Sequence, residues 1–280
     1  MTAATARTPP GVPAGAPSRG TRFTRLMLAE WTKIRSVRST FWALILLVVL
    51  DLGFTALFMG LTVGQWDKTD AEDRATLAAD PVSSILGSGF FLSQLTVCVL
   101  GVLVIASEYS TGMIRASLLA VPRRLPMLWA KATVFALVVL VLGTAVSFVS
   151  FFMGAAILHD KVEVSLGDPG VLRAVIGGGL YLAMLGLFAL AVGAIVRHPA
   201  GGITGVIGFV LVLAPLAQLL PGSIGEHVHA YLPSEAGHLI ANAHQGKDDL
   251  LTPWQGYGVF ALWTFALLTV AAVLLKRRDA

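Results

Sequence analysis

Residues 41–63, FWALILLVVLDLGFTALFMGLTV, form an apolar run that contains one charged side chain, Asp51. A bilayer has a hydrocarbon core about 30 Å thick, which a helix of about 20 apolar residues can cross. Five further apolar runs of comparable length lie near 85–107, 128–158, 172–196, 200–220 and 256–275. The sequence therefore predicts an all-α integral membrane protein with six transmembrane helices.

The segments between these runs alternate in charge. Of the 20 Lys and Arg residues, 15 lie before residue 41, around 108–131, at 197–198 or after 275, whereas 12 of the 16 acidic residues lie in 64–84, 159–171 and 221–255. Because an excess of Lys and Arg in short loops marks the cytoplasmic side, we expect both termini to be cytoplasmic. The chain is then a multi-pass protein of the cell (plasma) membrane, in contact with the lipid bilayer.

Composition limits the other classes of protein. With 56% apolar and 13% charged residues, and no inter-span loop above roughly 35 residues, a separate globular domain is not expected between the spans. The net charge of +4 is compatible with nucleic-acid binding, but basic flanks that orient the spans explain it better, so no nucleic-acid partner is expected. The only cysteine, Cys98, lies within a span and excludes an intrachain disulfide.

The chain before the first span divides into two parts. Residues 1–20 are rich in Ala, Pro and Gly and are predicted to form a disordered cytoplasmic tail; the first apolar run is too long for a signal peptide. Residues 22–38 have helical periodicity, with Phe23, Leu26, Met27, Trp31, Ile34 and Val37 on one stripe. This pattern predicts an amphipathic helix at the cytoplasmic membrane surface.

Glu30 projects from within that apolar stripe. A carboxylate pressed into lipid is costly, so this side of the helix is expected to face protein, with basic groups on neighbouring helices or on a partner subunit as counter-charges. The alternative is a glutamate that extends to the headgroup boundary without a partner.

Asp51 lies about halfway along the first span, and intramembrane acids are functional candidates by default. No Lys or Arg lies at comparable depth in another span. We expect a protonated carboxyl group that is hydrogen-bonded to a neighbour such as Thr55 or faces a hydrated cavity, with Gln94 as a candidate partner. A structural hydrogen bond and a role in a transport pathway both remain open.

Other spans contain packing and bending signals. Gly60/Gly64, Gly201/Gly205 and 177–179 have spacings that allow close helix contact. Pro215 predicts a kink or break in the fifth span. In 221–255, Pro233 begins a pattern typical of a short helix, and one or two such helices are expected there.

The stretch 108–122 lies in the cytoplasmic loop between spans 2 and 3. Ser110 or Thr111 can cap a helix whose apolar stripe includes Met113 and Leu118, and Pro122 can end it. Such a helix either lies passively on the membrane or docks into a groove of a partner protein.

Three segments resemble ABC-2-type transporter permeases. The spacing Glu-x3-Gly-x5-Leu-Leu-x2-Pro-x-Arg is similar to their first intracellular loop and falls on Glu108, Gly112, Leu118, Leu119, Pro122 and Arg124. Residues 29–36, Ala-Glu-Trp-Thr-Lys-Ile-Arg-Ser, resemble their cytoplasmic connecting helix, and Tyr-Leu-Pro-Ser-Glu-Ala-Gly at 231–237 resembles their external loop between spans 5 and 6. With the topology, the resemblance covers about 22–278, so 21–280 would form one six-helix permease domain.

The resemblance implies an exporter in which two permease units, identical copies or paralogues, bind two separate cytoplasmic ABC ATPase subunits. This chain is then not an enzyme: it has no Gly-x4-Gly-Lys-[Ser/Thr] phosphate loop, and ATP and Mg²⁺ are expected on the partner. No cofactor or metal is expected in this chain. The residues assigned to ATPase coupling are Glu30, Trp31, Lys33, Arg35, Glu108, Tyr109, Thr111, Gly112, Met113, Arg115, Leu118 and Pro122.

The alternative is a stand-alone multi-pass protein, either an intramembrane hydrolase or a secondary transporter. Neither Gly-x-Ser-Gly with a membrane histidine nor His-Glu-x-x-His occurs. A secondary transporter typically has internal repeats and several midplane polar groups, whereas here Asp51 and Gln94 are the main ones. Four histidines in one external loop, 227, 229, 238 and 244, could gather a zinc ion, although scattered loop histidines are usually solvated.

Overall fold

The computed structural model describes residues 19–113, 124–246 and 249–277, with the side chains of 19–22 and 124 excepted. The described residues form helices and no strand. The elements are α1 (Arg19–Ser36), α2 (Arg38–Gly64), η1 (Trp66–Lys68), α3 (Ala71–Ala79), α4 (Pro81–Ser110), α6 (Arg124–Leu158), α7 (Val171–Val196), α8 (Pro199–Ile207), η2 (Gly208–Val212), α9 (Leu213–Gln218), α10 (Ser223–Ala230), α11 (Pro233–His238), η3 (Leu239–Ala241) and α12 (Pro253–Arg277). The expected tail falls largely outside this range.

Six helical segments are long and apolar enough to cross a membrane: α2, α4, α6, α7, the stretch Pro199–Gln218 and α12. They coincide with the six runs predicted from the sequence. Proline opens several of them, as Pro81, Pro199 and Pro253 do, because the first turn of a helix needs no donor from that residue. The all-helical architecture is that of a multi-pass membrane protein.

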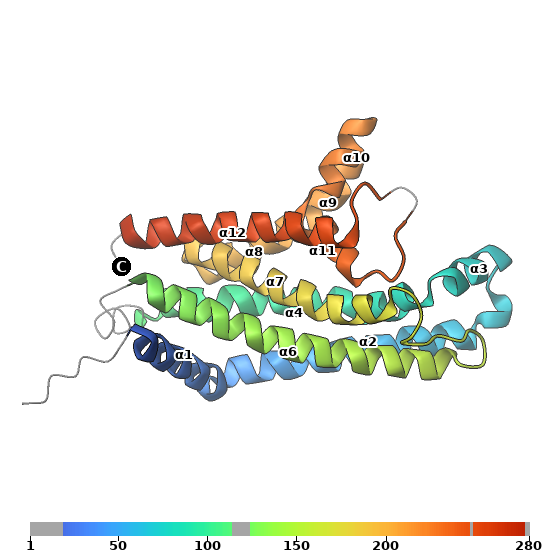
Figure 1. Cartoon of the computed structure of the whole chain (residues 1–280), viewed down its shortest axis with the longest axis horizontal. Coiled ribbons are helices and arrows are strands. Elements are labelled where there is room, and N and C mark those ends of the chain that lie inside the picture. The colour runs from blue at the N-terminus through green and yellow to red at the C-terminus, as the bar shows by residue number, and fades with distance from the viewer. Residues whose placement is uncertain (1–18, 114–123, 247–248, 278–280) are drawn as a thin grey trace, which may run out of the picture.

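Helix α7 occupies the centre of the bundle. It packs against α4, α6 and α12, and its buried side chains include Tyr181 and Phe188 (Figure 1). A side chain at 177, 178 or 179 would collide with the backbone of Ile240 or with Ser147 and Thr144, so the small-residue cluster does permit close contact. Of the two other pairs, Gly60 and Gly64 face open space among the described residues, and Gly201 and Gly205 lie near the side chains of Val196 and Val192, at the end of the neighbouring α7.

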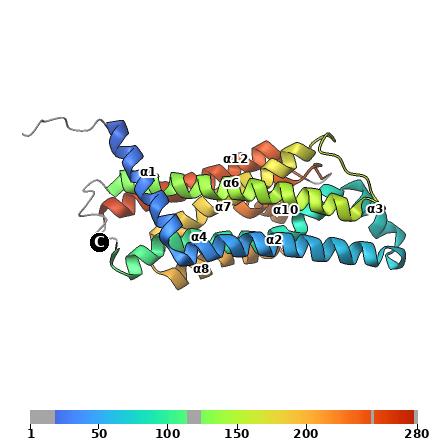
Figure 2. The same cartoon turned by 90° about the horizontal axis from the view of Figure 1, so that it is seen from below.

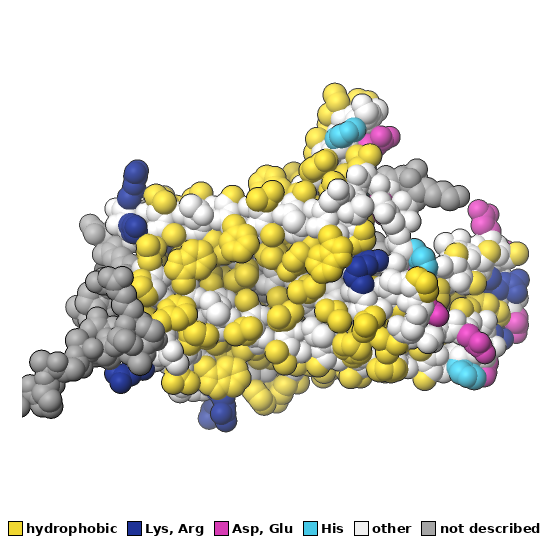
Figure 3. Space-filling view, in the orientation of Figure 1, with side chains coloured by type: hydrophobic (Ala, Val, Ile, Leu, Met, Phe, Trp, Pro, Cys, Tyr) yellow, Lys and Arg dark blue, Asp and Glu magenta, His cyan; other side chains and the backbone are white. Residues whose placement is uncertain are grey.

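The two ends of the bundle differ in charge. The start of α1 and the end of α12 lie at one end, and α3 lies at the other (Figure 1). Acidic side chains gather at the α3 end, where some Lys and Arg also lie, while Lys and Arg alone are visible at the end of α12 (Figure 3). Helix α1 crosses the bundle obliquely and joins α2 through the single extended residue Val37 (Figure 2).

The fifth span is irregular, as Pro215 predicts. Its middle, Gly208–Val212, is a π-helix segment directly before α9, which contains the proline. Beyond it the chain forms the short helices α10 and α11, and Pro233 is the first residue of α11, as expected.

Candidate functional site

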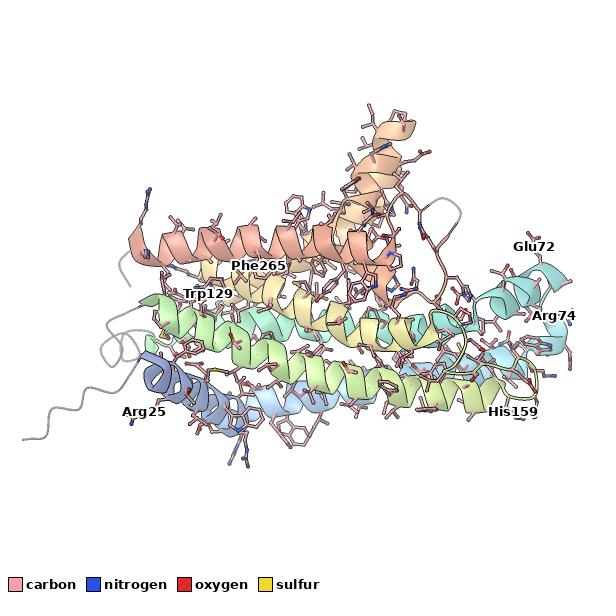
Figure 4. All side chains as sticks on the ribbon, in the orientation of Figure 1. Arg25, Glu72, Arg74, Trp129, His159 and Phe265 are labelled. Atoms are coloured by element: carbon pink, nitrogen blue, oxygen red, sulfur yellow. The ribbon has the colours of Figure 1, made fainter. Side chains whose placement is uncertain are left out.

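The N-terminal helix turns its predicted apolar stripe towards protein. Helix α1 packs on α6 and α2, and Glu30 and Ile34 are buried in that contact. Arg25, in contrast, points away from the bundle (Figure 4). Part of the stripe is therefore covered by helices of the same chain, with Glu30 in a protein contact, while Trp31 and Val37 of the stripe remain exposed.

Glu30 belongs to a cluster of four charged side chains from three helices, which we call the charge cluster: Glu30 and Lys33 on α1, Glu108 on α4 and Lys131 on α6. The Lys131 ammonium donates to Glu30 Oε2 at 2.6 Å and to Glu108 Oε1 at 2.8 Å. Lys33 Nζ donates to Glu30 Oε1 at 2.9 Å and to Glu108 Oε1 at 3.0 Å. Each lysine thus bridges both glutamates, and the formal charges of the four groups cancel.

Burial differs within the charge cluster. Glu30, Glu108 and Lys131 are 3–5% exposed, whereas the Lys33 side chain is 35% exposed. Partial burial alone would lower the pKa of Lys33, but the hydrogen bonds and negative charges of Glu30 and Glu108 outweigh it and raise the pKa. Lys131 is therefore the buried centre of the charge cluster, and Lys33 closes it towards solvent.

Glu108 has unused hydrogen-bonding capacity. Both lysines bond to Oε1, and the buried Oε2 has no partner among the described residues. A carboxylate oxygen without a donor in a buried position is costly. The charge cluster is thus neutral in charge but incompletely hydrogen-bonded at the residue nearest the loop that follows α4.

Helix α4 ends two residues after Glu108. The Thr111 hydroxyl donates back to Ser107 O at 2.7 Å, and Gly112 has φ +70°, a left-handed conformation that favours glycine after a helix end. Gly112 in the predicted spacing is explained by this turn. The rest of the predicted coupling helix, including Arg115, Leu118 and Pro122, lies outside the described residues.

Tyr109 takes part in a second junction at the same end of the bundle. The Arg197 guanidinium lies over its ring, 4.9 Å from the centroid, and donates to Leu274 O at 3.4 Å. Arg197 has φ +60° and occupies the two-residue turn between α7 and α8. This contact links α4, that turn and the end of α12.

The remaining predicted coupling residues do not join the charge cluster. Trp31 and Met113 are 44% and 50% exposed, and Arg35 is also exposed. They lie on the surface and are accessible to another molecule.

Asp51 lies at the contact of α2, α4 and α6. Its carboxyl oxygens each accept a hydrogen bond, one from Ser93 and one from Ser150, both at 2.5 Å. Asp51 is 4% exposed, and none of the described Lys or Arg residues forms an ion pair with it. The carboxyl group therefore joins three spans through hydroxyl groups.

Two predicted partners of Asp51 are wrong. Gln94 instead accepts a hydrogen bond from the Tyr181 hydroxyl at 3.0 Å, because its side chain points to α7. Thr55 is fully buried, but its hydroxyl has no partner among the described residues. The two serines that do bind Asp51 were not distinguishable in sequence from the other hydroxyl residues of the spans.

The four external histidines have separate surroundings. His227 contacts Ser223 O, His229 contacts Gln218 and Glu235, and His244 lies near Asp80. His238 packs edge-on against the rings of Phe90 and Tyr181. In the part of the chain that the structure describes, no three His, Cys, Asp or Glu side chains converge as metal ligands.

Comparison with known proteins gave no relative: no protein-family model and no curated protein matches the chain. The fold itself defines the class, a helical multi-pass membrane protein. Among the described residues, the charge cluster joins α1 to α4 and α6, the two spans on either side of residues 111–123.

Sequence reasoning found Glu30 and Glu108 but missed Lys131 as their partner. Lys131 lies inside the apolar run 128–158, and a lysine within a span is itself a signal of a buried partner. Arg197 carried no such signal, because a basic residue in a short polar turn is typical of any membrane protein.

Proposed function

We propose that the chain is the membrane-spanning permease subunit of an ATP-binding-cassette exporter of the ABC-2 type, and that separate ATPase subunits bind the end of the bundle that carries α1. The observation that carries the proposal is the charge cluster. It fastens an N-terminal helix to the last turn of α4 and the first turns of α6, which are the two spans on either side of the proposed docking loop.

This arrangement suits transmission of force. A displacement of the loop at 111–123 would act on Glu108 and Lys131, and both bind Glu30 directly. Separating the members of a buried ion pair leaves an uncompensated charge, which is strongly destabilising. We therefore expect α1, α4 and α6 to move together. The exposed Trp31, Arg35 and Met113 would contribute to the surface that meets the ATPase.

The energy source lies outside the chain in this proposal. The sequence has no phosphate loop, so ATP and Mg²⁺ would bind to the partner. A second permease copy or paralogue would complete the membrane path. The apolar spans suit an amphiphilic cargo, and export from the plasma membrane follows from the family resemblance.

The test is co-purification with reconstitution. The tagged chain is co-expressed with a candidate cassette ATPase, purified in mild detergent and placed in proteoliposomes. Glu108→Ala is expected to reduce transport and its coupling to ATP hydrolysis, with insertion unchanged, and Glu72→Ala at the far end of the bundle is the matched control. Transport without any ATPase, or equal activity of both variants, would contradict the proposal.

The second candidate is a stand-alone secondary transporter, and Asp51 is the observation that favours it. A buried carboxyl group at the junction of three spans is a possible ion or proton site. In that case Asp51→Asn would abolish gradient-driven transport in vesicles that contain only this chain. The permease proposal predicts no transport by the chain alone.

A further inference from the structure

Helices α9 and α10 form a helical hairpin, here called the arm, that extends sideways from the bundle near the start of α12 (Figure 1). The turn between them contains Gly222 at φ +65°. At Gly225, a side chain would collide with the backbone of Leu220 and Ala217, so the two legs of the arm pack closely. The arm lies at the end of the fifth span, far from the charge cluster.

The two flanks of α10 differ in polarity. Glu226 and His229 line a cavity of about 810 Å³ that is also lined by Glu235, Asp249 and other residues. Ile224 and Val228, four residues apart and therefore on one stripe, are 68% and 42% exposed. They lie roughly opposite Glu226, because two residues advance a helix by about 200°.

The polar flank faces the residues that precede α12. The cavity that Glu226 lines is also lined by Asp249, Leu250 and Leu251, which Thr252 separates from the first residue of α12, at the end of that helix opposite the charge cluster. Figure 3 shows an acidic and a histidine side chain on the arm beside its hydrophobic side chains. The apolar flank consequently lies on the side of α10 turned away from this cavity.

The apolar flank continues the surface of the membrane-spanning helices. Leu216 and Leu219 on the first leg of the arm are 52% and 78% exposed, and Leu262 on α12 is 73% exposed. At the base of the arm, Trp263 Nε1 donates to Tyr231 O at 3.1 Å, and the start of α12 carries the exposed Trp254. Aromatic residues of this kind are enriched where spans meet the headgroup region.

We propose that α10, the second leg of the arm, is a membrane-surface element, immersed in the headgroup region of the leaflet farther from α1. Ile224 and Val228 contact the acyl chains, and Glu226 and His229 face water. The occupant of the apolar flank is lipid, because the polarity of α10 is aligned with the direction across the membrane and its apolar side chains continue those of α9 and α12. A second copy of the chain would not require this alignment.

Depth-dependent quenching tests the proposal. In a Cys98→Ala background, Val228→Cys and Glu226→Cys are each labelled with an environment-sensitive fluorophore and reconstituted in phosphatidylcholine–phosphatidylglycerol vesicles. The label at 228 is expected to show blue-shifted emission that is quenched by a shallow doxyl lipid and little by aqueous iodide. The label at 226 is expected to show the reverse, and Ile224→Cys provides a second apolar position if labelling at 228 disturbs folding.

Two outcomes would overturn the proposal. Equal iodide quenching at 224, 228 and 226 would place the whole arm in water. Shielding of 228 from both quenchers, together with intermolecular disulfide formation by Val228→Cys, would show that a second copy covers the flank. Both readouts are independent of ATPase activity and therefore of the proposed function.

Discussion

Lys131 shows how one buried cation can organise the end of a membrane bundle. Its ammonium accepts no hydrogen bond and has three donors, two of which bind Glu30 and Glu108 on different helices. Without these carboxylates, a 3% exposed lysine would be an isolated charge in a region of low dielectric. The interaction therefore constrains α1, whose sequence would otherwise suit a membrane surface equally well.

Glu30→Gln is expected to destabilise the protein more than Lys33→Gln. Glu30→Gln leaves buried Lys131 with one anionic partner, so its cost should lie at the lower end of the about 3–5 kcal/mol typical of breaking a buried pair. Lys33→Gln should cost about 1 kcal/mol or less, because the lysine side chain is 35% exposed and its interactions are screened. Denaturation of the purified variants in mixed micelles measures the difference, and equal stabilities would show that the charge cluster does not hold α1.

Asp51→Asn is expected to keep stability close to that of the original protein, because an amide can hydrogen-bond to both serine hydroxyls. Asp51→Leu removes both contacts and should cost about 1 kcal/mol, given that a hydrogen bond between membrane helices contributes about 0.6 kcal/mol on average. The same denaturation assay compares the two. If Asp51→Asn keeps stability but abolishes transport, the carboxyl group acts in a pathway and not only as a link between spans.

At the scale of elements, the short helix α11 depends on an unusual neighbour. His238 packs edge-on against the rings of Phe90 and Tyr181, which also contact each other, and burial lowers the pKa of its imidazole below the usual value. His238 therefore binds a proton less tightly in the folded protein than in the unfolded chain. Aromatic packing of this kind stabilises α11 against α4 and α7 only while the imidazole stays neutral.

Acidification below pH 6.5 is expected to lower the melting temperature of the purified protein. The sign follows from linkage: a histidine with a depressed pKa contributes stability above its unfolded pKa, 6.5, and the contribution is lost as the pH falls through the folded pKa. His238→Phe should flatten this dependence in a fluorescence melting series. Burial raises the pKa of Glu235, so this group alone would make the protein more stable as the pH falls. If the melting temperature of His238→Phe depends on pH as strongly as that of the original protein, another group causes the dependence.

At the scale of the whole molecule, the six spans were predictable because crossing a bilayer demands long apolar runs whatever the function. Pro215 likewise predicted an irregular fifth span, because proline removes a helix hydrogen bond. The partners of Asp51 were not predictable, because the rotation of each span about its axis decides which serine faces it. For the same reason Gln94 was paired wrongly, and the Gly60/Gly64 spacing, which allows close helix contact, is not used for one among the described residues.

The charge asymmetry of the bundle predicts its orientation. Single cysteines in place of Asp70 and Arg123 lie on opposite sides if the Lys- and Arg-rich end is cytoplasmic. On intact cells, an impermeant thiol reagent is expected to label Asp70→Cys and not Arg123→Cys, and permeabilised cells should label both. Labelling of Arg123→Cys alone on intact cells would show that the Lys- and Arg-rich end is external, which contradicts the predicted topology.

The most direct test of the permease proposal is photo-cross-linking at the two ends of the bundle. A photoreactive residue at Arg25, on the side of α1 turned away from the bundle, is compared in cells with one at Glu72 on α3 (Figure 4). We predict that the probe at 25, and not the probe at 72, forms an adduct with a cassette ATPase, identified by mass spectrometry through its phosphate loop. Transport by the modified chain without any ATPase adduct at 25 would contradict the proposal that a partner ATPase drives this protein from the end that carries the charge cluster.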